Sequence, residues 1–277
     1  MKAFPTALET YRTCPRKWSF DQDRELKRQH RKPSIPAFVG SCVHEALEVF
    51  FDPARTPMPE RTHERLVQLL RDAWAGKLAW GARAEARRQE RRQLFGHDRA
   101  TEAGVGEKAK HMLFRFVRTA DLTVVPMTTE QFHEAPIAGG RHVLAGKIDR
   151  VDRLADGSLR LVDYKTGRSK SAALLRAEDL QLPAYALILS RKFKAPVARC
   201  AMLYLDEDIE VGFEPDEAWL HAREAALIEL IDRLEADTTR PPTPGPACSF
   251  CDYRAICPEG TAAMEALALP PGDALPF

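Results

Sequence analysis

Two apolar, strand-forming segments near the middle of the chain constrain its fold more than any other feature. The first is HVLAGKIDRVDRL, which ends at Leu154, and the second is SLRLVDYKT, which begins at Ser158. Only Ala155-Asp156-Gly157 separates them, a loop length typical of a β-hairpin in which the glycine is left-handed. We therefore predict an antiparallel hairpin in which Leu154 pairs with Ser158.

The register of this hairpin decides which side chains share a face of the sheet. With a three-residue loop, Asp149 lies opposite Asp163, and directly opposite residues project to the same side. Lys165, two residues beyond Asp163, joins them on that face. A two-residue loop would instead bring Asp149 to the side of Tyr164, so the arrangement depends on the turn.

The order of the predicted elements indicates the fold class. The first helix is predicted over TALETYRTCPRKWSFDQ with Thr6 as its N-cap, a second over VGSCVHEALEVFF, and further helices over most of residues 62–119. Strand-forming segments begin at residue 123, and helix, strand and helix then follow. This order predicts an α/β fold with a central mixed β-sheet flanked by helices. We expect one domain over residues 1–265, with a helical insert at about 62–119, and a flexible tail over 266–277.

Composition and charge set the broad class of the protein. Of its 277 residues, 44% are hydrophobic and 29% are charged, which is a globular balance, and the formal net charge is +1. No apolar run approaches the length of a membrane span, and the first residues lack the apolar core of a signal peptide. We therefore expect a cytoplasmic protein without a membrane partner, in which cysteines stay reduced.

The predicted pair of Asp149 and Asp163 indicates a cation site. Two carboxylates one strand apart repel each other unless a cation lies between them, and oxygen ligands of this kind suit Mg²⁺ or Mn²⁺. A bound divalent ion lowers the pKa of a water ligand, and Lys165 beside it would orient that water or neutralise developing charge. The alternative is a surface hairpin with an ordinary Asp–Lys ion pair, and the hairpin alone leaves both interpretations open.

Three further polar residues lie in segments predicted to be helical. His44 is flanked by apolar residues, and a lone histidine in such a helix is more often a core residue than a metal ligand. Gln181 and Tyr185 are four residues apart, so both can reach one point beside their helix. Taken by themselves, these residues favour a structural role over a functional one.

Three of the six cysteines form a compact C-x2-C-x5-C cluster at Cys248, Cys251 and Cys257. Such spacing is typical of metal ligation, and four thiolates complete either an iron–sulfur cluster or a structural zinc site. Cys14, in TYRTCPRKW, is the best candidate for the fourth ligand. A site completed by Cys14 would join the two ends of the chain and stabilise the whole fold.

Taken together, these motifs resemble the PD-(D/E)xK nuclease superfamily, in its RecB-like branch with a C-terminal iron–sulfur cysteine cluster. The matching order is CPRK, GSCVHEALE, GKIDRVD, VDYKTG, QLPAYA and the three-cysteine cluster, over roughly residues 4–260. Each motif is short, but six of them in this order form a specific signal. The resemblance implies a restriction-endonuclease-like core and a metal-dependent phosphodiester hydrolase.

The resemblance also implies a role for each matching residue. The residues that it assigns to the metal are His44, Asp149, Asp163 and the backbone carbonyl of Tyr164. Lys165 is expected to position the attacking water, and Gln181 and Tyr185 would steady that lysine or the DNA. An acidic position near the metal in some relatives corresponds to Glu130 or to Glu134, and the sequence leaves this choice open.

For the cysteines, the resemblance implies a 4Fe–4S cluster held by Cys14, Cys248, Cys251 and Cys257, with structural zinc as the alternative. For function, it implies an Mg²⁺- or Mn²⁺-dependent DNA nuclease, expected to be an exonuclease on single-stranded DNA or DNA ends in repair or recombination. A CRISPR-adaptation-type nuclease and a non-catalytic DNA-binding subunit with the same fold are the alternatives.

Three further features concern partners. The chain has no P-loop signature, GxxxxGK followed by Ser or Thr, so unwinding would need a helicase or repair partner. Arg83, Arg87 and Arg91 share one face of a predicted helix and could bind phosphates, although Glu85 and Glu90 between them are equally typical of a solvated face. The final residues DALPF faintly resemble peptides that bind bacterial sliding clamps.

Overall fold

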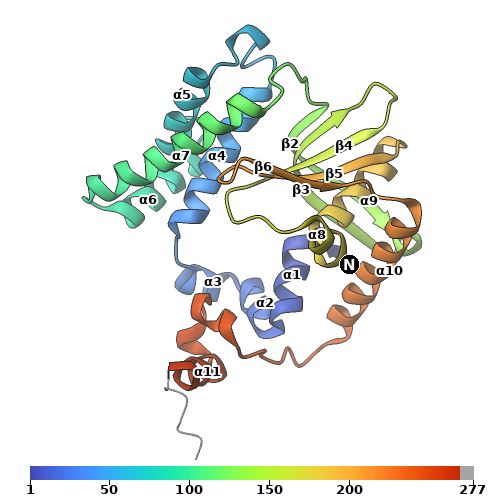
Figure 1. Ribbon diagram of the computed structural model, residues 1–277. Helices are drawn as coiled ribbons and strands as arrows, with labels where there is room; N and C mark the ends of the chain where they lie inside the picture. Colours follow the sequence, from blue (N-terminus) through green and yellow to red (C-terminus); the bar gives the residue numbers. More distant parts are fainter. Residues whose placement is uncertain (269–277) are drawn as a thin grey trace, which may run out of the picture.

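The computed structural model describes residues 1–268, which fold around one mixed six-stranded sheet (Figure 1). The strands are β1 (Lys2–Ala3), β2 (Thr128–Ile137), β3 (His142–Arg153), β4 (Leu159–Lys165), β5 (Val197–Tyr204) and β6 (Ile209–Phe213). The sheet order is β1-β3-β4-β5-β6, and β2 forms an additional pair with β3. β1 runs parallel to β3 and β4 runs parallel to β5, whereas the other pairs are antiparallel.

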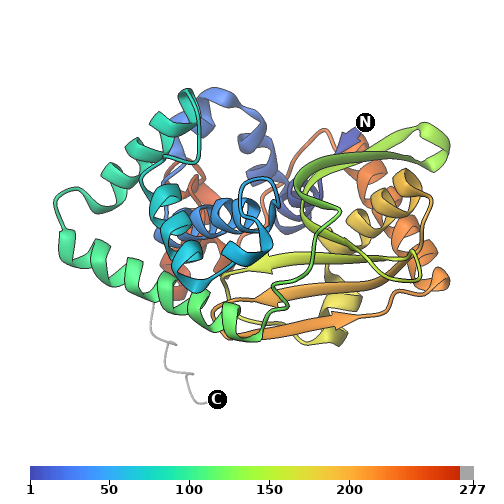
Figure 2. The same ribbon diagram turned by 90° about the horizontal axis from the view of Figure 1, so that it is seen from above.

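Helices cover both faces of this sheet (Figure 1, Figure 2). The helices on one face are α1 (Pro5–Thr13), α9 (Gln181–Phe193) and α10 (Glu217–Ala236), whose apolar side chains share a core with Leu144 and Leu161. The helices on the other face are α4 (Ile35–Phe51), α5 (His63–Trp74), α6 (Ala82–Phe95) and α7 (Arg99–Thr119), in a second core that reaches Val162 and Tyr164. This confirms the predicted α/β class with a mixed central sheet between helices.

Shorter elements complete the described chain. They are α2 (Pro15–Gln22), α3 (Arg24–His30), η1 (Met58–Glu60), η2 (Ala138–Gly140), α8 (Ala172–Glu178), η3 (Pro246–Phe250), η4 (Arg254–Ile256) and α11 (Pro258–Ala268). The segment from η3 to α11 lies beside α2, although the two are far apart in sequence (Figure 1). Buried Tyr253 donates its hydroxyl hydrogen to Asp21 over 2.7 Å, and the Arg16 amide donates to the Pro241 carbonyl over 3.3 Å.

The hairpin between β3 and β4 has the register that its three-residue loop predicts. Arg150 pairs with Val162, and the amide of Leu154 donates to the carbonyl of Ser158 over 2.8 Å. Gly157 has a φ of 85°, the left-handed conformation that this loop requires. The ladder ends one pair before the two aspartates, so Asp149 and Asp163 lie just beyond the paired part of the hairpin.

The N-terminal helix differs from its prediction. Instead of one helix capped by Thr6, the structure has α1 and α2, which meet at Cys14. α1 begins at Pro5 without a side-chain cap. Pro15 explains the break, because a proline pushes the residue before it out of the helical conformation, and Cys14 is indeed extended. The Cys14 sulfur instead caps α2 by accepting the Lys17 amide over 3.4 Å.

Two observations concern the end of the chain and membranes. α11 extends to Ala268, into the segment predicted as the start of the tail, and DALPF lies outside the described residues. Within residues 1–268 no single helix combines the length and the apolar character that a membrane span needs. The pair of α3 and α4 meets both criteria only when taken together, and it is bent by 109°.

Candidate active site

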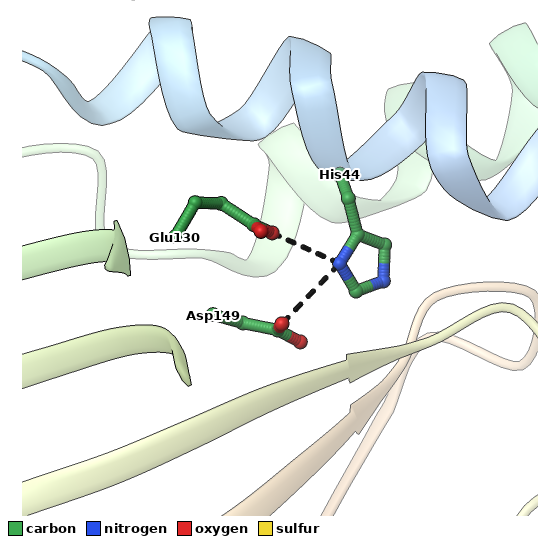
Figure 3. Close-up of side chains that lie close together, drawn as sticks. All are labelled: His44, Glu130 and Asp149. Carbon is green, nitrogen blue, oxygen red and sulfur yellow. Dashed lines mark hydrogen bonds and ion pairs between the residues drawn. The ribbon is translucent and has the colours of Figure 1, made fainter. Parts of the chain in front are cut away.

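The first group of candidate site residues gathers where α4 passes the pair of β2 and β3 (Figure 3). The Nδ1 atom of His44 lies 3.0 Å from Glu130 Oε1 and 3.4 Å from Asp149 Oδ1. Each of the three side chains offers a ligand atom within 4.8 Å of the other two. The His44 Nε2 atom lies 3.1 Å from the backbone carbonyl oxygen of Tyr164. One imidazole, two carboxylates and one carbonyl thus meet, and this donor set suits a divalent cation.

An irregularity in β2 and β3 turns these carboxylates toward α4. Glu130 has a φ of 49°, in the left-handed region that residues other than glycine rarely adopt. Its neighbours on both sides pair with β3, which leaves Glu130 opposite Asp149. Ile148 and Val151 both pack into the core beneath α9, although residues three apart in a regular strand face opposite sides. The chain therefore bends at Asp149.

Several charged groups surround His44. Although burial opposes protonation, hydrogen bonds to Asp149 and Glu130 raise the pKa of His44 to about 10. The Lys147 ammonium lies 2.6 Å from Glu130 Oε2. Glu48, one turn further along α4, faces the same group: its pKa is raised chiefly by burial, and Lys147 lowers it while Glu130 raises it. Several carboxylates therefore converge here, which is the electrostatic environment of a cation site.

The second group lies on β4 and α9, next to the first. The Lys165 Nζ atom lies 2.5 Å from Asp163 Oδ2 and donates to Gln181 Oε1 over 2.9 Å. The Gln181 amide in turn donates to the hydroxyl of Tyr185 over 3.1 Å. These contacts form a chain from the carboxylate to α9 that fixes the direction of the lysine side chain.

Asp163 is the most unusual side chain of the site, because only 1% of it is exposed. Apart from the Lys165 contact, no hydrogen bond from the described residues reaches its carboxylate oxygens. Burial, opposed by Lys165 and reinforced by Asp149, raises the pKa of Asp163 to about 7. A buried carboxylate whose one partner is a lysine, and which lies beside a second carboxylate, is costly unless a further cation compensates it.

Gly146 allows α9 to approach the sheet at this point. A Cβ atom at position 146 would lie 2.5 Å from Cε1 and 3.1 Å from the hydroxyl oxygen of Tyr185. Real Cβ atoms essentially never approach another atom so closely, so a side chain here would displace the Tyr185 ring. The glycine of the GKIDRVD motif therefore helps to position Tyr185, Gln181 and Lys165.

Asp149 connects the two groups, since its Oδ2 atom accepts the amide hydrogen of Tyr164 over 2.8 Å. The predicted residues that the structure brings together are His44, Glu130, Asp149, Asp163, Tyr164, Lys165, Gln181 and Tyr185. Glu134 lies apart from them, exposed and paired with Lys2, so Glu130 is the one of the two glutamates that lies beside His44. Sequence reasoning missed Glu48 and Lys147; the four-residue spacing from His44 to Glu48 was the available signal.

The arginine face of α6 is not the free phosphate-binding surface that the sequence suggested as one interpretation. Arg87 is buried, and its guanidinium contacts Glu45 over 2.9 Å and Glu90 over 3.4 Å. Arg91 forms an ion pair with Glu102. Two of the three guanidinium groups are therefore occupied by carboxylates of the protein itself.

The four candidate cysteines line one small hollow where the two ends of the described chain meet. They are Cys14, Cys248, Cys251 and Cys257. The Cys14 sulfur accepts the Thr243 amide over 3.5 Å, in addition to the Lys17 amide. A Cβ atom at Gly260 would lie 3.5 Å from two of the four sulfurs, so this residue faces the hollow directly.

Comparison with known proteins gives three findings. A family model described as the PD-(D/E)XK nuclease superfamily matches residues 4–258. No curated protein matches the chain significantly. Among solved structures 19 chains match, and one of them, "Crystal structure of SSO0001", is 16% identical with a TM-score of 0.43, over 93% of this chain and 85% of that chain.

Proposed function

The chain belongs to the PD-(D/E)XK nuclease superfamily, and we propose that it is a divalent-metal-dependent nuclease that hydrolyses phosphodiester bonds in DNA. The observation that carries this proposal is the buried carboxylate of Asp163, which has no hydrogen-bond donor apart from the Lys165 contact and lies beside a converging imidazole and two further carboxylates. Such an arrangement is unfavourable as a purely structural feature and favourable around a cation.

The residues present fit Mg²⁺ or Mn²⁺. The groups that would hold the ion are His44, Asp149, Asp163 and the carbonyl of Tyr164, with Glu130 beside them. When bound, the ion supplies Lewis-acid stabilisation of the scissile phosphate and acidifies water. Lys165, held by Asp163 and Gln181, would orient the attacking water and stabilise developing negative charge. Tyr185 keeps the Gln181 amide in the orientation that Lys165 requires.

Digestion of end-labelled DNA tests this function. Wild-type protein and the Lys165→Ala variant are incubated with single-stranded and double-stranded DNA, linear and circular, in the presence of Mg²⁺ or Mn²⁺. We expect wild type to degrade linear single strands or ends and to leave circles intact, whereas Lys165→Ala binds DNA without cutting it. Binding without cleavage by either protein would instead identify a non-catalytic DNA-binding subunit, and cleavage of circles would identify an endonuclease.

We further propose that the chain is of the RecB-like type and that its four cysteines hold a 4Fe–4S cluster. Four sulfurs around tetrahedral zinc lie about 3.8 Å apart, given Zn–S bonds of about 2.3 Å. Among the described residues, the groups of three ligand atoms within 4.8 Å of one another include none of these cysteines. A cubane cluster binds each thiolate at a different corner and suits this wider spacing. The amide hydrogens on the Cys14 sulfur also fit a cluster ligand.

Metal analysis of protein purified without air tests the cluster. Wild type should be brown, with broad visible absorbance and about four iron atoms per chain. Cys14→Ser should lose most of the iron, whereas Cys42→Ala, which removes a buried thiol in α4 outside the hollow, should keep it. A colourless protein that contains one zinc would contradict the proposal.

The partners that we propose follow from the expected substrate. Unwinding of duplex DNA in repair or recombination would come from a helicase or another repair protein, since the chain has no P-loop signature. The terminal DALPF would contact a sliding clamp, and a clamp pull-down with and without these last five residues tests that contact.

A further inference from the structure

We propose that the ring of Phe132 is a stacking platform for an unpaired nucleobase of the strand that enters the metal site. The inference rests on the proposed nuclease function and deepens it, because it makes single-stranded DNA or a frayed end the preferred substrate. It assigns a binding role to Phe132 of β2, a residue that is not one of the candidate catalytic residues.

Phe132 lies on the side of the sheet that faces α4. It pairs in register with Lys147 of β3, and directly opposite residues project to the same side. The Lys147 ammonium reaches Glu130 over 2.6 Å, and Glu130 contacts His44. Two residues of a strand span roughly 6–7 Å, so one polynucleotide strand can contact both the ring and the metal site.

The ring is also available to a ligand. Phe132 is 52% exposed, and β2 pairs only with β3 among the described residues. Phe4 lies beside it, with ring centroids 6.3 Å apart and a tilt of 46°. The Lys2 ammonium lies 5.0 Å from the centroid of the Phe132 ring. The exposed rings of Phe4 and Phe132 therefore lie close to Lys2 and Lys147. Lys147 connects this aromatic pair to the candidate catalytic residues through its contact with Glu130.

This combination fits nucleic acid better than a protein partner. Sites for single strands combine aromatic rings, on which bases stack, with cations that follow the phosphates. Phe132 supplies the ring. Lys2 and Lys147 lie beside it on the surface, in ion pairs with Glu134 and Glu130, and phosphates of a bound strand would compete with these carboxylates for the two ammonium groups. A base inside a duplex is already stacked on both faces and cannot offer a face to the ring. The platform therefore favours unpaired nucleotides, independently of their sequence.

Binding measurements in the Lys165→Ala background test the platform without cleavage. The probe is a short labelled oligothymidylate, intact or with one abasic position, and the readout is fluorescence anisotropy. Adding Phe132→Ala should weaken binding of the intact probe about tenfold, whereas Phe132→Trp should retain it. Trp80→Ala, which removes a ring that is 87% exposed in the turn between α5 and α6, should have no effect. The abasic position facing the ring should weaken binding only when Phe132 is present.

Each outcome decides the proposal. The proposal is supported if Phe132→Ala and the abasic position together weaken binding no more than either change does alone. This conclusion holds whether or not the wild-type protein cleaves DNA. Unchanged affinity of Phe132→Ala overturns the platform, while cleavage by wild type would leave the proposed function intact. An equal loss in Phe132→Trp, or a change of oligomeric state seen by light scattering, would reveal a role in folding or in self-association and would also overturn it. Absence of binding by the parent protein contradicts both proposals.

Discussion

His44 and Glu130 are 86 positions apart in the sequence, yet His44 Nδ1 and Glu130 Oε1 lie 3.0 Å apart. The contact links the middle of α4 to the one left-handed residue of β2. The three helices α5, α6 and α7 lie between these residues in the chain and pack on α4 and its neighbours. The contact therefore depends on tertiary packing around α4 and on the left-handed conformation of Glu130.

Separate substitutions of the two candidate acidic residues of β2, Glu130 and Glu134, test that contact. Glu130→Gln should lower kcat for DNA cleavage by about 10–100-fold, because it removes a carboxylate that orients His44 beside the proposed metal. Glu134→Gln is the matched control on the same strand, and it should change kcat less than about twofold because its carboxylate faces Lys2. Equal losses in both variants would contradict the assignment.

Gly146→Ala should affect both stability and activity, because the new methyl group would collide with Tyr185. We expect the free energy of unfolding to fall by about 1–3 kcal/mol and kcat to fall through the displaced Gln181 and Lys165. Gly104→Ala in α7, where a Cβ atom meets nothing within 4 Å, should be neutral or stabilising by up to about 1 kcal/mol. Urea unfolding and cleavage assays of the two variants give the comparison, and a fully active Gly146→Ala would refute the packing argument.

Arg87→Ala should destabilise the protein without a specific effect on DNA affinity. Its guanidinium compensates the carboxylate of Glu45, whose second oxygen is buried without a hydrogen bond from the described residues. Removing one partner of a buried pair should cost about 2–4 kcal/mol of unfolding free energy. The exposed Arg83→Ala is the control and should leave stability unchanged. Normal stability with weakened DNA binding in Arg87→Ala would instead support a phosphate-binding role.

Acid should destabilise the fold partly through His133. Burial, with the nearby Lys192 ammonium, lowers the pKa of His133 to about 4, below its ordinary value of 6.5. The unfolded chain therefore binds more protons than the native protein between these values, so this stability is complete above pH 6.5 and is lost as the pH falls toward 4. We expect a loss of about 1 kcal/mol by pH 5.

Thermal unfolding as a function of pH measures this contribution. His133→Gln should flatten the curve between pH 6.5 and 4, the interval set by the two pKa values. His97→Gln, at an exposed position next to α7, should keep the wild-type slope. A wild-type slope in His133→Gln would show that other groups dominate the acid response.

The hairpin and the fold class could be predicted because both depend on local patterns. The loop at Gly157 selects the turn, and the turn fixes the register of β3 and β4. By contrast, β1 comprises only Lys2–Ala3 and exists because of its pairing with β3 much later in the chain, so no local pattern marks it. The break at Cys14 had a local signal in Pro15, and the sequence-based prediction missed it.

The site shows the same division between local and distant causes. His44, Asp149, Asp163 and Lys165 occur in recognisable motifs. The choice of Glu130 over Glu134 depends on a left-handed backbone conformation that a β-rich segment does not reveal. The burial of Arg87 depends likewise on Glu45 of another helix, so a helical wheel of α6 alone suggests an open basic face.

The meeting of the two ends of the described chain has a consequence for biosynthesis. Cys14 leaves the ribosome early, but the other three cysteines of its hollow follow only after the sheet and α10 have been translated. In a nascent chain, β1 can pair once β3 has been translated, whereas Cys14 must wait for its three partner cysteines until α10 has also been made. If these cysteines hold the proposed cluster, it can assemble only after Cys257 has been translated, and chains that terminate before that residue could not form it.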